Sequence, residues 1–136
     1  MTSFIYKAGG ILIKDKKILL TRAKNKDFFV APGGKMEPNE TLEDCLIREL
    51  QEELRITIAQ EDLTSFGTFT APAAGKEEVM LEMTVYIVSD WQGEIAPSNE
   101  VEEVLWYDSS LKGKYKLGSI FEHEVIPKLI EEHLIT

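Results

Sequence analysis

The chain has 136 residues, of which 43% are hydrophobic and 29% are charged, and its single cysteine excludes an internal disulfide. This profile predicts one globular domain over residues 1–136, not a disordered or fibrous protein. The net charge of -9 disfavours a nucleic acid polymer as partner, because no cluster of lysine and arginine offsets the repulsion of its phosphates. The N-terminus does not resemble a signal peptide, and no apolar run approaches the roughly 18 residues of a membrane span. We therefore expect a cytoplasmic protein without a membrane partner.

The first part of the chain shows two patterns typical of strands. Residues 10–14 and 17–22 are β-prone and are separated by an Asp-Lys pair, which predicts a β-hairpin. The short apolar run 28–30 ends at residues 31–34, Ala-Pro-Gly-Gly. Proline followed by paired glycines is expected to stop a strand there and to permit unusual backbone angles.

After this loop the hydrophobic period changes from that of a strand to that of a helix. Between residues 41 and 54 the apolar residues recur at steps of three and four, which predicts an amphipathic helix. Thr41 and Asp44 resemble a capping box at its start, with aspartate in place of the usual glutamate or glutamine.

The second half of the chain reads as strands followed by a helix. Further strands are expected at residues 56–58, 63–70, 79–89 and 101–107, with loops at residues 71–76 and 92–99. Residues 119–134 predict a helix, in which Pro127 either makes a kink or starts the last segment. Several strands with one central and one terminal helix indicate an α/β fold, a mixed sheet covered by helices.

Three glutamates share one face of the central helix. At about 100° per residue, Glu49, Glu52 and Glu53 fall within roughly a 100° arc. Like charges at this spacing repel by some tenths of a kcal/mol per pair, so a compensating cation is expected. Arg48 can supply part of it, and magnesium, which prefers oxygen ligands, would supply more. On its own, the same stretch is also compatible with a solvated helix face.

The frame around these glutamates resembles the signature of the Nudix hydrolase family. The signature runs Gly, five residues, Glu, seven residues, then Arg-Glu-apolar-any-Glu-Glu-any-Gly-apolar. Within residues 34–56 the matching positions are Gly34, Glu40, Arg48, Glu49, Leu50, Glu52, Glu53 and Ile56. Arg55 stands where the family has glycine. Because a left-handed conformation past a helix end costs an L-residue roughly 1–2 kcal/mol, we expect a strained cap or a differently closed helix there.

The resemblance implies a Nudix-type α/β/α sandwich with a mixed β-sheet, and roles for individual residues. Glu52 and Glu53 look like metal ligands, Glu49 like a metal ligand or general base, and Arg48 would orient Glu49. The carbonyl of Gly33 is a further candidate ligand, because paired glycines let the backbone approach closely. The implied catalytic residues are thus Glu49, Arg48 and Glu52, and the implied cofactor is Mg²⁺, with Mn²⁺ left open.

Four other glutamates are weighed beside this set. Glu40 is expected to brace the loop against the helix. Many family members add a carboxylate from a later loop, and Glu100 is the candidate here, with a solvated strand edge as an equal alternative. Glu102 and Glu103 are the other candidates in the same segment, and for Glu103 the solvated edge is preferred.

The implied reaction is attack of water on phosphorus in a nucleoside diphosphate linked to a group X, which releases a nucleoside monophosphate. Metal ions would lower the pKa of a bound water, and a glutamate would take its proton. Cys45 lies on the apolar helix face and is expected in the core, which disfavours covalent catalysis. Nucleoside triphosphates, oxidised ones included, are the first expectation for the substrate, since the chain is short.

Two alternatives remain open at this point. ADP-ribose is suggested by Pro72, which stands at a distance past the signature similar to that of a proline in members that cleave ADP-ribose. A catalytically silent module that binds a nucleotide is the other, although Glu49, Glu52 and Glu53 are all retained.

Candidate residues for the substrate itself are few. Arg22, Lys24 and Lys26 could meet its phosphates, although a solvated basic loop is the preferred interpretation, and Lys35 is a further basic candidate. Phe28 and Phe29 could lie near its base, with at least one of them expected in the core. The expected partner is a small nucleotide. Relatives in the family often pair, and the sequence leaves a monomer and a homodimer open.

Overall fold

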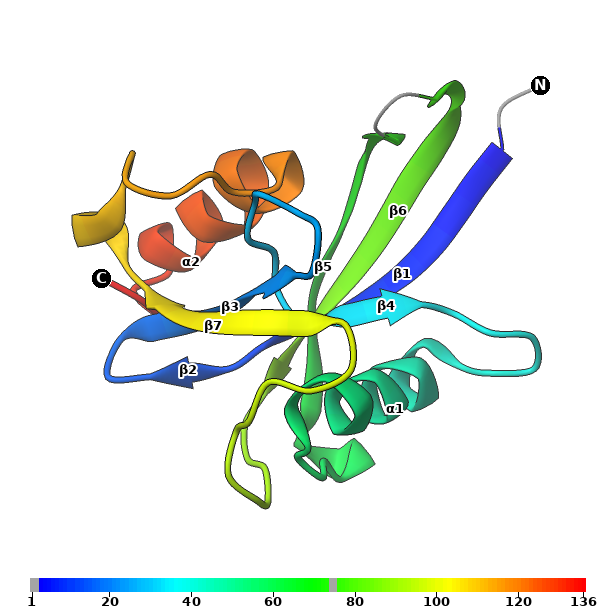
Figure 1. Cartoon of the computed structure of the whole chain (residues 1–136), viewed down its shortest axis with the longest axis horizontal. Coiled ribbons are helices and arrows are strands. Elements are labelled where there is room, and N and C mark those ends of the chain that lie inside the picture. The colour runs from blue at the N-terminus through cyan, green and yellow to red at the C-terminus, as the bar shows by residue number, and fades with distance from the viewer. Residues whose placement is uncertain (1–2, 74–75) are drawn as a thin grey trace.

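Two β-sheets lie between two helical layers in the computed structural model, which describes residues 3–73 and 76–136 (Figure 1). The first sheet has the strand order β4-β1-β6-β5 and consists of β1 (Ser3–Ile11), β4 (Gly33–Lys35), β5 (Leu63–Ala73) and β6 (Lys76–Val88). The second sheet, in the order β2-β3-β7, consists of β2 (Ile13–Lys14), β3 (Lys17–Ala23) and β7 (Val101–Tyr107). The central helix α1 (Leu42–Leu54) lies on one side and the terminal helical segment on the other.

The first sheet is mixed. β1 pairs parallel with β6 and antiparallel with β4, and β5 pairs antiparallel with β6. The second sheet is antiparallel throughout. The predicted α/β class with a mixed sheet is confirmed.

Successive strand residues contribute to two different cores. In β3, Ile18 and Leu20 pack in the core beneath the terminal helix, while Leu19 packs in the core beneath α1. Such alternation follows from the two-residue period of a strand. The apolar face of α1 fills its core with Cys45, Leu46, Leu50 and Leu54. Both faces of β3 are therefore buried, and the opposite face of α1 is exposed to solvent.

The start and end of α1 follow from the sequence. Thr41 lies at the N-cap, where its side-chain oxygen accepts a hydrogen bond from the Asp44 N–H at 3.1 Å. Arg55 closes the helix in a left-handed conformation (φ 59°, ψ 32°), and its N–H donates to the Gln51 carbonyl. Both the cap and the strained end are as predicted.

The first strand and the Pro-Gly-Gly segment differ from prediction. β1 begins at Ser3, well before the predicted start at residue 10, and the hairpin joins β2 and β3 through Asp15 and Lys16, both with positive φ. Residues 28–30 form only isolated bridges, while the glycines themselves form β4. The glycines extend a sheet because β1 offers them an unpaired edge.

Two further expectations are wrong in part. Residues 56–58 make no strand, because Ile56 and Ile58 are anchored in the core and only Thr57 bridges to Gln92. The predicted loop 71–76 is shorter, since β5 runs to Ala73 and β6 starts at Lys76; residues 74–75 of that prediction lie outside the described part. Pro72 lies in β5, an edge strand, where a missing N–H is tolerated.

The terminal segment contains a π-helical turn, Phe121–Val125, followed by α2 (Ile126–Glu131). Pro127 lies in the first turn of α2. Of the two predicted roles for this proline, a kink or the start of the last segment, the second is confirmed. The helix ends before the predicted residue 134, because His133 takes a left-handed conformation. Short 3₁₀ turns occupy Gln60–Asp62 and Ser109–Leu111. Within residues 3–73 and 76–136, the helices lack the length and apolarity needed to cross a bilayer.

The left-handed Arg55 generates a stability prediction. We expect Arg55→Gly to be about 1–2 kcal/mol more stable than Arg55→Ala in urea unfolding, because glycine adopts this conformation without the penalty of a Cβ. Both variants lose the same side-chain contacts, so their difference isolates the backbone. Equal stability of the two variants would show that Arg55 is not strained.

Candidate functional site

The site forms where β4 lies against the exposed edge of α1. A Cβ on Gly34 would overlap the Glu49 carboxylate, and a Cβ on Gly33, whose φ is 148°, would overlap the Ala8 carbonyl oxygen of β1. Only glycine lets this backbone pass between β1 and the helix. The paired glycines therefore bring the main chain into contact with the helix carboxylates.

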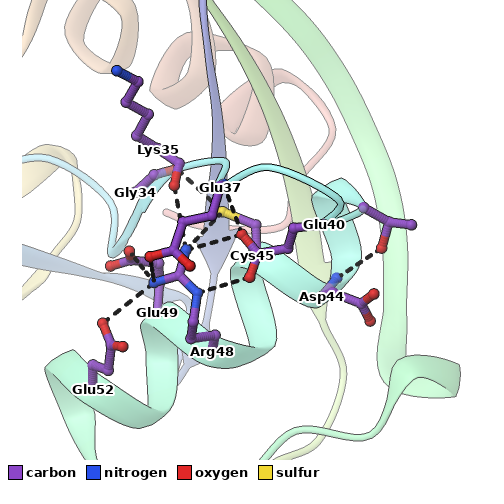
Figure 2. Close-up of polar contacts among 10 residues, drawn as sticks. Gly34, Lys35, Glu37, Glu40, Asp44, Cys45, Arg48, Glu49 and Glu52 are labelled. Atoms are coloured by element: carbon purple, nitrogen blue, oxygen red, sulfur yellow. Dashed lines mark hydrogen bonds and ion pairs between the residues drawn. The ribbon is translucent and has the colours of Figure 1, made fainter.

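Arg48 and Glu40 form a two-pronged ion pair that ties the loop before α1 to the helix (Figure 2). Arg48 Nε donates to Glu40 Oε2 at 2.7 Å, and Nη2 donates to Oε1 at 3.0 Å. Glu40 Oε1 also accepts from the Glu37 N–H at 2.9 Å. These bonds, that of Arg48 first, lower the pKa of Glu40 to about 2. The predicted bracing role of Glu40 is confirmed.

The remaining N–H groups of Arg48 point at the other glutamates of the helix. Nη1 donates to Glu49 Oε1 at 2.8 Å and to Glu52 Oε2 at 3.4 Å. The Glu40 bond, and next the Glu49 bond, raise the pKa of the guanidinium. One cation thus offsets the repulsion of neighbouring carboxylates, and it holds the Glu49 side chain in place.

Glu53 is the buried member of the set. Its exposed fraction is 9%, and its Oε1 accepts the Gly33 N–H at 3.5 Å. Within the described residues no basic side chain pairs with it. Burial, followed by the hydrogen bond and negative charge of Glu49, raises the pKa of Glu53 well above its ordinary range. Glu53 therefore retains its proton near neutral pH.

The donor chemistry of this pair fits a hard divalent cation. Carboxylate and backbone oxygens are the ligands that Mg²⁺ and Mn²⁺ prefer. A cation would take the place of the Glu53 proton and remove the cost of burying this carboxylate. The described side chains include no group of three histidine, cysteine, aspartate or glutamate residues arranged to hold a metal. Arg48 binds Glu49 at 2.8 Å, and Glu53 is protonated.

Glu100 is not brought into contact with the helix carboxylates by any described hydrogen bond or ion pair. Its carbonyl accepts the Lys24 N–H at 2.8 Å, and its exposed side chain faces solvent. Glu103 pairs with Arg22 at 2.7 Å, and Glu102 lies 3.9 Å from the same guanidinium. Glu103 is thus engaged in an ion pair across β3 and β7.

Arg22, Lys35 and Phe28, which were considered as contacts of the substrate, differ in their neighbours and in their exposure. The Arg22 guanidinium is already engaged by Glu103 and by the Lys26 carbonyl. The Lys35 carbonyl accepts a hydrogen bond from Arg48 Nη2 at 3.3 Å. The Lys35 side chain points away from the ion-pair cluster in Figure 2. Phe28 is half-buried, whereas its neighbour Phe29 is part of the core.

Sequence reasoning placed Cys45 correctly and missed one contact. Cys45 is fully buried, and burial raises the pKa of its thiol to about 11, so it is protonated at neutral pH. The missed contact joins Tyr86 of β6 to Glu43 of α1, whose Oε1 accepts the hydroxyl proton at 2.9 Å. These residues are distant in the chain, and no local spacing could have paired them.

Residues 5–128 match the NUDIX domain family. An ADP-ribose pyrophosphatase of Methanocaldococcus jannaschii is 33% identical over 122 residues, 88% of this chain and 68% of that protein. An uncharacterized Nudix hydrolase of Bacillus subtilis, YvcI, is 32% identical over 72% of this chain, which spans 62% of the length of that protein. An 8-oxo-dGTP diphosphatase of Proteus vulgaris is 32% identical over 65% of this chain and 78% of its own.

The fold is similar to that of solved structures. A MutT structure described for Aliivibrio salmonicida and Vibrio cholerae superposes with a TM-score of 0.74 and 22% identity, over 96% of this chain and 99% of that one. At this identity the likeness concerns the fold alone, and it agrees with the predicted Nudix-type sandwich.

The raised pKa of Glu53 predicts how stability depends on pH without divalent metal. As pH rises above the ordinary carboxyl pKa of 4.5, the unfolded chain releases this proton before the folded chain does. Stability therefore falls between about pH 5 and about pH 9, the folded-state pKa of Glu53, with a slope of at most about 1.4 kcal/mol per pH unit from this group. Urea unfolding in EDTA should show a flatter profile for Glu53→Gln. The exposed Glu61→Gln is the matched control, and equal slopes in all three proteins would contradict the assignment.

Proposed function

This chain belongs to the NUDIX domain family and is a hydrolase of that family, and we propose that Glu49, Glu52 and Glu53 carry its reaction. The proposed reaction is hydrolysis of a phosphoanhydride bond in a nucleoside diphosphate linked to a group X. The observation that carries the proposal is the burial of Glu53 against Glu49 beneath the paired glycines, without a basic partner in the described residues. A buried carboxylate beside two further glutamates offers the oxygen ligands that a divalent cation prefers.

Hydrolases of this family generally need a divalent metal ion, and we propose Mg²⁺, with Mn²⁺ as the alternative. Glu49, Glu52, Glu53 and the Gly33 carbonyl would hold it, and Glu100 is proposed as a further ligand from the loop before β7. When bound, the ion neutralises phosphate charge and lowers the pKa of a coordinated water. We assign the general base to Glu49, because the Arg48 contact fixes its carboxylate.

The residues of the chain divide the remaining work between them. Arg48 keeps Glu49 in one orientation, and Glu40 keeps Arg48 in place through its two-pronged contact. Glu52 is more exposed than Glu49 or Glu53, with a side-chain exposure of 43%, so it can turn toward an arriving substrate. Lys35 and Phe28 remain proposed contacts of the substrate. Arg22 is proposed with them, on the condition that its bond to Glu103 is exchanged.

Nucleoside triphosphates, including oxidised ones, are the proposed substrates. The relative from Proteus vulgaris, an 8-oxo-dGTP diphosphatase, supports this choice. ADP-ribose is the second candidate, and the observation in its favour is that the Methanocaldococcus relative matches a larger share of this chain. The silent-module alternative has no support among these relatives, since the named activities are those of hydrolases.

Turnover of a substrate panel tests the proposal. We expect release of a nucleoside monophosphate from 8-oxo-dGTP, ordinary triphosphates or ADP-ribose, dependent on Mg²⁺ and abolished by EDTA. Glu53→Gln should lower kcat by about 10²–10⁴-fold, because it removes a charged site carboxylate, while Glu61→Gln should retain the wild-type kcat. The fastest substrate identifies X. Full activity of Glu53→Gln, or metal-independent turnover, would overturn the assignment.

A further inference from the structure

An open pocket of about 660 Å³ lies at the C-terminal end of α1, next to but distinct from the carboxylate cluster. Its walls come from the segment after β3, the end of the helix and the segment before β7. Arg55 is the only residue of the signature segment, residues 34–56, that lines the pocket. It is also the residue at which the chain departs from the signature.

Backbone hydrogen bonds hold the pocket walls together. The Ser98 N–H donates to the Glu53 carbonyl at 2.9 Å, which fastens the segment before β7 to the last turn of α1. The Lys24 N–H donates to the Glu100 carbonyl at 2.8 Å, which fastens the segment after β3 to the same stretch. The Arg55 side chain adds a bond from Nε to Ser98 Oγ at 3.2 Å. The lining residues are therefore held in place and do not depend on a loop closing.

The lining is rich in donors and carries excess positive charge. Lys24 and Arg55 both line the pocket, and neither forms an ion pair with a carboxylate in the part of the chain that is described. Asn25 and Asn99 add amide groups. The one acidic lining residue, Glu102, lies 3.9 Å from the Arg22 guanidinium, which partly neutralises it. In a chain of net charge -9, two cations without carboxylate partners that share one pocket form a local site for an anion.

The backbone at this pocket is strained in a way that presents these side chains. Asn25, Arg55 and Asn99 all have left-handed backbone, with φ of 67°, 59° and 55°. Asparagine tolerates this conformation, but arginine does so at a cost that glycine avoids. Strain of this kind accumulates at functional sites. Arg55 thus places a guanidinium at the pocket wall where glycine would be the more stable choice.

We propose that this pocket binds a phosphate-class oxyanion, with Arg55 and Lys24 as its charged contacts and the amides of Asn25 and Asn99 as further donors. A guanidinium matches the geometry of phosphate oxygens better than any other side chain. Arg55 follows Glu53 by two residues, and a phosphate group of the substrate is therefore one candidate source of the oxyanion. A substrate phosphate as the bound group rests on the proposed function, whereas binding of free inorganic phosphate does not depend on that function.

The test is a titration of metal-free ¹⁵N-labelled protein with inorganic phosphate in EDTA, followed by amide chemical shifts. We expect saturable shifts at residues 24, 25, 55, 98 and 99. The affinity should be at least about tenfold weaker in Arg55→Gly and Lys24→Ala, because each removes a charge-assisted contact. Arg55→Gly also relieves the backbone, so loss of folding cannot explain its weaker binding. Lys112→Ala, an exposed lysine elsewhere, is the matched control. Unchanged affinity in Arg55→Gly, or shifts confined to residues 49–53, would overturn the proposal.

A second arm separates the two sources of phosphate. A non-hydrolysable nucleoside triphosphate analogue is titrated into the same proteins under the same conditions. If its affinity also falls in Arg55→Gly, the oxyanion is part of the substrate; if only the affinity for inorganic phosphate falls, the pocket serves the free ion. Either result supports the proposed pocket. If Arg55→Gly lowers the affinity for neither ligand, the proposal is overturned. Phosphate binding in a protein that fails every turnover assay would reject the proposed function and leave this inference intact.

Discussion

The two-pronged contact between Arg48 and Glu40 is the interaction on which the site depends. It ties the loop that follows β4 to the middle of α1, and so it holds Gly33 and Gly34 against the helix. The same guanidinium reaches Glu49 at 2.8 Å. One side chain therefore links the loop, the helix and the Glu49 carboxylate. A lysine could supply the charge but not the planar fork.

This arrangement permits an otherwise unfavourable burial. Glu53 has no basic partner among the described residues, and it is kept in the interior by the core beneath α1, to which Leu50 and Leu54 belong. The helix cannot turn Glu53 outward without exposing these side chains, since all lie on one rigid element. Packing energy thus holds a carboxylate where solvation alone would not leave it. A buried carboxylate with a high affinity for a proton is also expected to bind a cation that replaces the proton. The packing that buries Glu53 is therefore also the basis of the proposed chemistry.

Local patterns predicted much of this structure, and long-range pairing explains what they missed. The helix, its Thr41 cap and the strain at Arg55 followed from spacing and from backbone preferences within a few residues. The pairing of Gly33 and Gly34 with β1 could not be foreseen, because proline and glycine locally disfavour a strand and only the edge of β1 overrides this. The contact of Tyr86 with Glu43 and the pocket beside Arg55 likewise join segments that no sequence period relates. The sequence thus indicated which carboxylates gather, and the fold determined which of them is buried.

The central claim is that the buried Glu53 carries a proton that a divalent cation replaces. Calorimetric titration of the metal-free protein with Mg²⁺, in two buffers of different ionisation enthalpy near neutral pH, measures the protons released on binding. The account predicts release of about one proton per protein, and no such release from Glu53→Gln. Binding of Mg²⁺ to the wild-type protein without proton release, or identical release from the variant, would contradict it.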